Sequence, residues 1–401
     1  MKLLIYSHYF APSVGGVETI VQSLARGLAE LRTPKGEPEF EITLATRTLA
    51  AGFDDNSLPF AVVRRPTLIH LWDLVRASDV VHVAGAAIAP LALGYLARKP
   101  VAIEHHGYHA ICPNGLLVQR PEKRVCPGHF VKRHYGQCRR CLRQEFSSLQ
   151  SWAQLLRQFP RSFLARRVAT NIAISDHSLK RCALPHAALI CHGMDDPLAA
   201  RPSFGGPSSP ASKTCFAYVG RLVSEKGVDV LLEASRLLRE EGHSFAVRLI
   251  GDGPERSKLE AIIARKHLEN SVQVTGFLTG AAFQEALRDV RVVVMPSVWE
   301  ETAGLAAMEQ MMRGRLVIAS DIGGLGEIVG DTGLKCAPGD AVVLAGAMRT
   351  VLQQPGLIDS FGKRARERAL MLFAYERMIA EHARVYRDLF AAHAKPAQVP
   401  S

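Results

Sequence analysis

The sequence has no run of residues that is long and apolar enough to cross a membrane. Its most apolar window, residues 80–97, is interrupted by His82 and Pro90. The apolar stretch at the N-terminus breaks at Ser7 and His8 and is too short for a signal peptide. We therefore expect a cytoplasmic protein, with a peripheral position on the inner face of the membrane as an added option.

Cysteine is also scarce. Eight Cys in 401 residues exclude a disulfide-rich scaffold. Internal repeats and extended low-complexity tracts are missing, which leaves an ordinary globular chain. Hydrophobic residues make up 48% of the sequence and are ample for burial. Since 401 residues exceed the usual size of one hydrophobic core, we expect two α/β domains.

The net charge of +11 comes from one part of the chain. Residues 120–181 hold fourteen Lys and Arg against three Asp and Glu, an excess that equals the whole net charge. This basic segment is either a solvated face or a surface that attracts anionic lipid headgroups or an anionic acceptor.

Short apolar strands alternate with helical patterns in both halves of the chain. The first half begins with a strand at 2–6 and a helical pattern at 17–31, and further strands are expected at 42–45, 80–84, 101–103 and 171–174. The second half repeats the alternation, with strands expected at 216–219, 246–250, 272–275, 291–295 and 316–319. This alternation predicts parallel sheets covered by helices, with functional residues in the loops after the strands.

Two further segments complete the domain plan. Residues 201–213 hold three Pro and two Gly among Ser and predict a linker. Residues 373–390 form an amphipathic helical pattern, with Met378, Val385 and Leu389 on one stripe.

A pair of cations follows the first strand of the second half. Arg221 and Lys226 stand in the loop 218–227, between a strand and a helix. Arg supplies a planar fork and Lys a point charge, which together suit a diphosphate. The alternative is that both are surface cations.

Two carboxylates, Glu301 and Glu309, follow a later strand of the same half. Gly304 lies near the expected helix start, where the amides of Gly304 and Leu305 can face phosphate oxygens. Glu309 can accept hydrogen bonds from two ribose hydroxyls, and Glu301 can reach the sugar ring. The spacing of the two Glu is by itself a weak signal.

Five strings occur in order along residues 214–390: G-R-L-x-x-E-K-G, G-D-G-P, V-T-G-F, P-S-x-x-E-E-x-x-G-L-x-x-x-E and G-G-x-x-E. Their order and spacing resemble the GT-B glycosyltransferases of family 4. The Gly15-Gly16-Val17-Glu18 segment and the segment 190–195 are similar to the same family more loosely. The implied fold is α/β, GT-B, with two Rossmann-like doubly wound domains facing a cleft.

The resemblance implies a retaining, metal-ion-independent transfer of a sugar from a nucleoside-diphosphate sugar. By position it assigns the diphosphate to Arg221 and Lys226, the ribose to Glu309, the donor sugar to Glu301, and backbone amides to Gly304 and Leu305. Ala303 and Gln310 depart from the family pattern and put the local pocket shape in doubt.

The resemblance also sets the domain roles. It implies an acceptor-side domain at 1–200 with a basic, Cys-containing insertion at about 110–145, the linker at 201–213, a nucleotide-sugar-binding domain at 214–372, and a helix at 373–395 that returns to the first domain. No cofactor is required for catalysis on this reading, and the donor is a substrate.

The first half offers weaker candidates. The resemblance implies a His after the strand at 101–103 that faces the donor sugar, and His106 matches better than His105. An imidazole there can bond a sugar hydroxyl or the migrating proton, or it can be structural. Gly15 and Gly16 let backbone approach the leaving phosphate or the acceptor, unless they form a plain turn.

Four of the eight cysteines, Cys112, Cys126, Cys138 and Cys141, lie within the basic segment or next to it. The last two have the C-x-x-C spacing of a metal knuckle, and four thiolates suit a tetrahedral structural zinc site. Free thiols or a disulfide are the alternatives. A closed site of four thiolates would not be catalytic.

From charge and family resemblance we expect the acceptor to be a glycan or lipid-linked saccharide of cell-envelope polysaccharide synthesis. A nucleotide-sugar epimerase or hydrolase on the same fold is the competing enzyme. A basic nucleic-acid-binding protein with a four-cysteine zinc site is the competing non-enzyme. The basic segment has little aromatic interleaving, so no nucleic-acid partner is expected.

Overall fold

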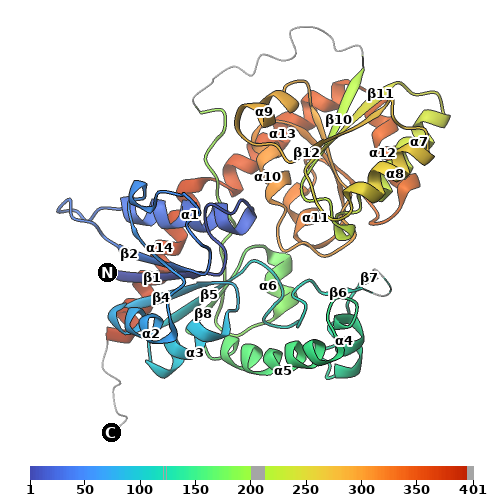
Figure 1. The fold of residues 1–401 in the computed structure, drawn as a ribbon. Coiled ribbons are helices and arrows are strands. Elements are labelled where there is room, and N and C mark those ends of the chain that lie inside the picture. Colours follow the sequence, from blue (N-terminus) through green and yellow to red (C-terminus); the bar gives the residue numbers. More distant parts are fainter. Residues whose placement is uncertain (121, 123, 200–212, 395–401) are drawn as a thin grey trace. The chain divides into compact units, whose positions relative to one another are not determined.

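The computed structural model describes residues 1–120, 122, 124–199 and 213–394. The chain divides into two compact units, each with its own sheet (Figure 1). The first comprises Met1–Pro121, Cys126–Met194 and Phe373–Ser401, and the second comprises Glu122–Val125 and Asp195–Leu372. The linker expected at 201–213 lies, apart from Lys213, outside the described residues.

The first unit is built on a seven-stranded parallel sheet in the order β3-β2-β1-β4-β5-β8-β9. Leu3, Leu4 and Ile5 are at most 1% exposed, as expected for a strand whose two faces are both covered by helices. The strand order reverses between β1 and β4. The strands are β1 (Lys2–Ser7), β2 (Glu41–Thr46), β3 (Ala61–Arg64), β4 (Val80–Ala84), β5 (Val101–His105), β8 (Thr170–Ala173) and β9 (Ala187–Leu189).

Helices connect these strands. They are α1 (Gly16–Glu30), α2 (Leu68–Ala77), α3 (Ile88–Leu96), α4 (Tyr135–Leu142), α5 (Ser148–Ala165) and α6 (Asp176–Cys182). The side chains of Ser147 and Ser175 form capping boxes that define the starts of α5 and α6. Shorter elements are a 3-10 turn at Asp55–Ser57 and the strand β6 (Val118–Gln119), while the short strand β7 (Arg124–Val125) is assigned to the second unit.

The last described helix, α14 (Tyr375–Ala394), belongs to the first unit although it follows the second in sequence. It packs on α1, and the Tyr375 hydroxyl donates a hydrogen bond to the backbone oxygen of Ser23 at 3.0 Å. Val385 and Leu389, expected on its apolar stripe, are only half-buried. Its buried residues are Met378, Ile379, His382, Ala383 and Tyr386.

The second unit contains a six-stranded parallel sheet in the order β12-β11-β10-β13-β14-β15. Its strands are β10 (Thr214–Val219), β11 (Phe245–Ile250), β12 (Val272–Gly276), β13 (Val292–Met295), β14 (Leu316–Ser320) and β15 (Leu334–Cys336). Here the order reverses between β10 and β13.

The helices of the second unit cover this sheet. They are α7 (Val228–Glu240), α8 (Arg256–Arg265), α9 (Gly280–Ala286), α10 (Leu305–Met312), α11 (Gly323–Val329), α12 (Ala341–Gln353) and α13 (Gly356–Leu372), with a 3-10 turn at Ser224–Lys226. A core of buried residues, including Phe216, Leu231 and Ile318, joins the helices to the strands.

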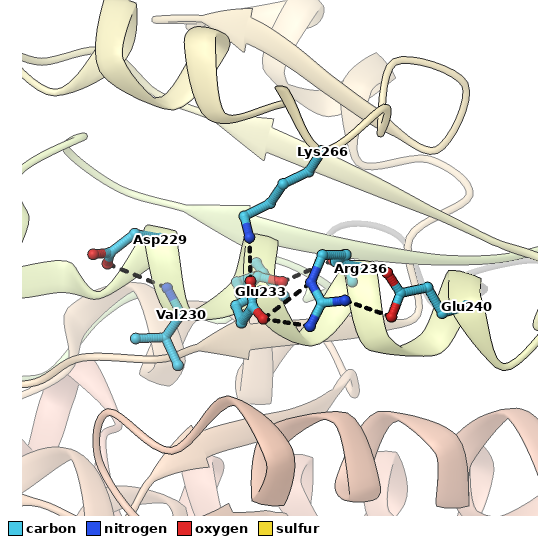
Figure 2. Close-up of polar contacts among 8 residues, drawn as sticks. Asp229, Val230, Glu233, Arg236, Glu240 and Lys266 are labelled. Carbon is cyan, nitrogen blue, oxygen red and sulfur yellow. Dashed lines mark hydrogen bonds and ion pairs between the residues drawn. The ribbon is translucent and has the colours of Figure 1, made fainter. Parts of the chain in front are cut away.

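A chain of ion pairs links α7 to the end of α8 (Figure 2). Glu233 pairs with Arg236 at 2.6 Å and with Lys266, and Arg236 also pairs with Glu240. Hydrogen bonds from Arg236 and then Lys266 lower the pKa of Glu233 to about 2. Because these side chains are partly exposed, the chain of pairs contributes little to stability.

The parallel sheets and their helical covering confirm the fold class predicted from the alternating pattern. Neither β3 nor α2 was predicted. The strand β3 was missed because it consists of four residues at the edge of the sheet, with no fully buried side chain. None of the helices described is long and apolar enough to cross a membrane.

Candidate functional site

The reversal of strand order in the second unit brings the predicted donor residues to neighbouring loops. β10 and β13 are adjacent and parallel, so their carboxyl ends meet at the same edge of the sheet. Arg221 and Lys226 follow β10, and Glu301 follows β13. Ligands of open α/β sheets bind at this type of position.

Glycines shape the loop that carries the two cations. Gly227 has a φ of +64°, and a Cβ there would lie 2.1 Å from the carbonyl oxygen of Pro296, so the β10 and β13 loops pack backbone to backbone. The Tyr218 hydroxyl donates a hydrogen bond of 2.7 Å to the Arg221 carbonyl oxygen. These contacts fix the loop and leave the Arg221 side chain exposed.

Lys226 and Glu301 form a close ion pair. The Nζ of Lys226 lies 2.8 Å from Oε2 of Glu301, and the two side chains are 20% and 4% exposed. The Ser297 hydroxyl donates to Oε1 of the same carboxylate, and the Trp299 ring centroid lies 5.9 Å from Lys226 Nζ. A nearly buried carboxylate is thus held by one cation and one hydroxyl.

The backbone of Glu301 rests on the start of α11. The Gly324 amide donates a hydrogen bond of 2.6 Å to the Glu301 carbonyl oxygen. Gly323 has a φ of +59°, and a Cβ there would approach the Glu301 nitrogen to 2.7 Å. The G-G-x-x-E string therefore has a packing function, since only glycine permits this contact.

Gly304 is the residue that precedes α10, and Glu309 lies within that helix. The first amides of a helix lack intrahelical partners, so the Leu305 amide is available to an anion. A Cβ at Gly304 would lie 2.9 Å from Leu325 Cδ1, which supplies a packing reason for this glycine as well. Glu309 pairs with Arg313 at 3.2 Å and is one-third exposed.

In the first unit, His106 belongs to a buried cluster around Glu104. His82 Nε2 and His106 Nε2 lie 3.4 and 3.3 Å from Glu104 Oε2. His192 Nε2 and His382 Nε2 lie 3.5 and 3.6 Å from Oε1. All five side chains are at most 7% exposed.

Burial by itself raises the pKa of Glu104, but the neighbouring imidazoles of His106, His192 and His382 outweigh it and hold that pKa well below the usual range. Burial lowers the pKa of His82 and of His192. Glu104 is therefore an ionised carboxylate among imidazoles. No local spacing in the sequence indicates this cluster, because its members come from separate segments of the chain.

His105, the alternative to His106, has a different environment. Its Nε2 lies 2.8 Å from Asn171 Oδ1, and burial lowers its pKa to about 4. His106 has both ring nitrogens buried, and its contact with a donor sugar stays a prediction.

Gly15 directly precedes α1, and Gly16 is the first residue of that helix. The φ of Gly15 is −171°, an extended conformation open to any residue, so its backbone requires no glycine. A Cβ at Gly15 would approach the Glu18 carboxylate to 2.4 Å. The close approach of a phosphate or an acceptor to Gly15 and Gly16 stays a prediction.

The four clustered cysteines line one small cavity of about 20 Å³ with Asn114. Burial, and then the neighbouring Cys112, Cys126 and Cys141, raise the pKa of Cys138 to about 12. Among the described residues, a different group has possible metal-ligand atoms that all lie within 4.8 Å of one another. This group is Glu104, His106 and His192.

The matches to known proteins together cover nearly the whole chain. Residues 204–368 match the family model described as Glycosyl transferases group 1. Glycogen synthase of Mycobacterium tuberculosis is 28% identical over 410 residues, which cover 96% of this chain and 94% of the relative. The comparisons support a glycosyltransferase. The 2-deoxystreptamine glucosyltransferase of Streptomyces kanamyceticus is 33% identical to this chain over 45% of the chain and 48% of its own length.

Solved structures agree on the fold of this chain. Anabaena HepE in complex with UDP has a TM-score of 0.71 at 18% identity and covers 97% of this chain and 100% of its own. Sucrose-phosphate synthase from Thermosynechococcus elongatus has a TM-score of 0.69 at 21% identity and covers 98% of this chain and 99% of its own. The GT-B fold with two Rossmann-like domains, expected from the sequence, is confirmed.

Proposed function

We propose that the protein is a retaining glycosyltransferase of family 4 that moves a sugar from a nucleoside-diphosphate sugar to an acceptor hydroxyl. The observation that carries the proposal is the Lys226–Glu301 pair beside Arg221 at the switch point of the second sheet. The UDP and UDP-glucose complexes of HepE give further support, because that protein has the same fold.

Each residue of the site has a distinct proposed role. Arg221 and Lys226 bind the diphosphate, and the amides of Gly304 and Leu305 bind its oxygens at the start of α10. Glu309 accepts hydrogen bonds from the ribose. Glu301, which Lys226 and Ser297 hold in place, accepts from a hydroxyl of the donor sugar.

In the proposed reaction the bond between the anomeric carbon and the phosphate oxygen breaks, and its electron pair stays on the diphosphate. Arg221 and Lys226 stabilise the charge that develops there. The acceptor oxygen then attacks the anomeric carbon from the same face and releases its proton to the departing phosphate oxygen. Two protein cations supply the positive charge, so we propose that the diphosphate needs no metal ion.

Two measurements test this function. A panel of nucleoside-diphosphate sugars is screened for thermal stabilisation of the protein, since a donor that binds the folded state raises the melting temperature. The product formed with an added acceptor is then analysed by NMR for its anomeric configuration. Retention of the donor configuration is expected. Inversion contradicts the retaining mechanism, and turnover that needs no acceptor indicates an epimerase or hydrolase instead.

For the acceptor side we propose a peripheral position on an anionic membrane surface. The exposed face of α5 carries an apolar stripe at spacings of three and four residues, and each member is at least 42% exposed: Leu149, Trp152, Leu156, Phe159 and Phe163. Arg139 lies over the Trp152 ring and Arg167 over the Phe163 ring, each at 4.6 Å. Apolar side chains flanked by arginines are typical of helices that lie in the membrane interface.

A cavity of about 430 Å³ lies next to this stripe, lined by Tyr95, Arg98, Lys99, Arg167 and His393 among others. Tyr95 contacts Phe163 edge to face at 6.5 Å, which joins the cavity to the stripe. Three cations around a partly apolar cavity suit an anionic headgroup. The surface therefore supports a lipid-linked or glycan acceptor of cell-envelope polysaccharide synthesis.

At the four cysteines we propose a structural zinc ion. Cys112, Cys126, Cys138 and Cys141 line one cavity, and four thiolates form a closed tetrahedral site for zinc. Such an ion would stabilise the segment between β5 and α5 and would take no part in the transfer.

A further inference from the structure

We propose that Glu104, His106 and His192 form a second metal site, which binds a divalent transition metal in the first unit. One oxygen of Glu104 and one nitrogen of each imidazole all lie within 4.8 Å of one another. Imidazole and carboxylate ligands suit Zn²⁺ and Fe²⁺. The site is separate from the four cysteines and from the donor residues of the second unit.

The distances around Glu104 support an ion rather than direct hydrogen bonds. The four imidazole nitrogens lie 3.3–3.6 Å from the carboxylate oxygens. Hydrogen bonds between N–H and O are about 2.7–3.2 Å long. Two ligand atoms on one tetrahedral metal ion, with bonds of about 2.0–2.2 Å, lie about 3.4 Å apart. The separations seen here thus match ligands that share an ion.

Both oxygens of Glu104 are buried and have no hydrogen-bond partner among the described residues. An ionised carboxylate in this environment is costly unless a cation compensates it. The Nε2 atoms of His82, His192 and His382 are buried around it and also have no hydrogen-bond partner within the described part of the chain. A divalent cation would satisfy the carboxylate and its imidazole neighbours together.

Two further contacts orient the imidazoles as metal sites require. The Nδ1 of His382 lies 2.9 Å from the Met378 carbonyl oxygen and must be its donor, so in the neutral ring the Nε2 lone pair faces Glu104. The Nδ1 of His82 lies 2.9 Å from the Tyr386 hydroxyl. Such outer contacts fix the tautomer of metal-binding histidines. His82 and His382 thus lie beside the carboxylate with fixed orientations, next to the three-residue group rather than within it.

The site would join distant parts of the chain. His82 lies in β4, Glu104 in β5, His192 after β9 and His382 in α14. One ion held by Glu104, His106 and His192 would therefore tie the end of β5 to the segment after β9. The predicted contact of His106 with a donor sugar would then be made through Nδ1, because Nε2 faces the ion.

Cobalt provides a direct test with the full chain. The protein is stripped with a chelator, titrated with Co²⁺, and followed by visible absorption and by metal analysis after desalting. A site of imidazole and carboxylate gives ligand-field bands without thiolate-to-cobalt charge transfer, which separates it from the four cysteines. We expect the bound cobalt to fall by one ion per chain in His192→Asn and in the near-isosteric Glu104→Gln.

The matched control is His105→Asn, because His105 is buried next to His106 but faces Asn171 instead of Glu104. This variant should keep the full cobalt content. Zn²⁺ should raise the melting temperature of the stripped wild type more than that of His192→Asn. If folded His192→Asn and Glu104→Gln bind as much cobalt as the wild type, with the same spectrum, the proposal is wrong. A fall in His105→Asn equal to that in His192→Asn also overturns it.

Discussion

Lys226 has two roles at the residue scale, and they can be separated. It neutralises Glu301, which is 4% exposed, and it is proposed to bind the diphosphate of the donor. The first role contributes to stability and the second to turnover. A comparison with another lysine that also pairs with a glutamate distinguishes them.

Replacement of Lys226 by Ala is expected to lower kcat by about 100-fold or more, because a preorganised charge at the departing group is lost. The unfolding midpoint should also fall, since Glu301 is left without its cation. The control is Lys266→Ala, which removes a lysine from Glu233 but leaves Arg236 as its partner (Figure 2). Steady-state kinetics of both variants check the prediction, and near-normal turnover in folded Lys226→Ala contradicts the role.

Glu309 should act on donor binding. The replacement Glu309→Gln removes the charged acceptor for the ribose hydroxyls, so we expect donor affinity to fall by about 10- to 100-fold. Arg313, which pairs with Glu309, stays in place and is tested separately by Arg313→Gln. Calorimetric titration with the nucleoside diphosphate alone is the measurement. An unchanged affinity in Glu309→Gln would remove the ribose assignment.

At the scale of elements, we expect the exposed apolar stripe of α5 to bind anionic membranes. The double replacement Leu156→Glu and Phe163→Glu puts carboxylates on the exposed stripe, so binding to anionic vesicles should fall at least about tenfold. Val342→Glu in the second unit changes an apolar residue that is at least as exposed and serves as the control. Vesicle co-sedimentation at low and high salt measures the effect. Equal binding of all three proteins would contradict a role for α5.

A second prediction at this scale concerns zinc binding by the four cysteines. Ser in place of Cys138 should reduce bound zinc by one ion per chain and lower the melting temperature. Zinc affinity should fall as pH is lowered, because protons compete for the thiolates. Metal analysis and a colorimetric zinc chelator check both statements. The control is Cys215→Ser, a buried cysteine of the second unit that should leave the zinc content unchanged.

At the scale of the whole molecule, the first unit depends on the end of the chain. A chain that stops after Leu372 lacks α14, whose residues Met378 and Tyr386 are at most 1% exposed. Removing this helix uncovers apolar surface of α1 and β4, so we expect the first unit to become sensitive to protease while the second stays resistant. Limited proteolysis with mass spectrometry tests this, with a chain that stops after Ala394 as the control.

Much of the architecture was predictable from local pattern. The strand Val80–Ala84 was expected at its observed bounds, because four apolar or small residues around one His fit a strand buried on both faces. The half-exposed edge strand β3 was missed, since an edge strand lacks that signal. On α14 the predicted stripe was right for Met378 but not for Val385 and Leu389, because the buried face also includes His382 and Tyr386, whose polar atoms contact Met378 and His82.

The sequence by itself determined the parallel α/β class and the loops that carry Arg221, Lys226, Glu301 and Glu309. Strand periodicity and short motifs are local properties, so the residue order contains them. Only the tertiary structure decided that Lys226 pairs with Glu301 and that four histidines surround Glu104. Several of these contacts join segments that are far apart in the chain, such as Glu104 and His382. Their partners are selected by strand order and helix packing, which no local spacing encodes.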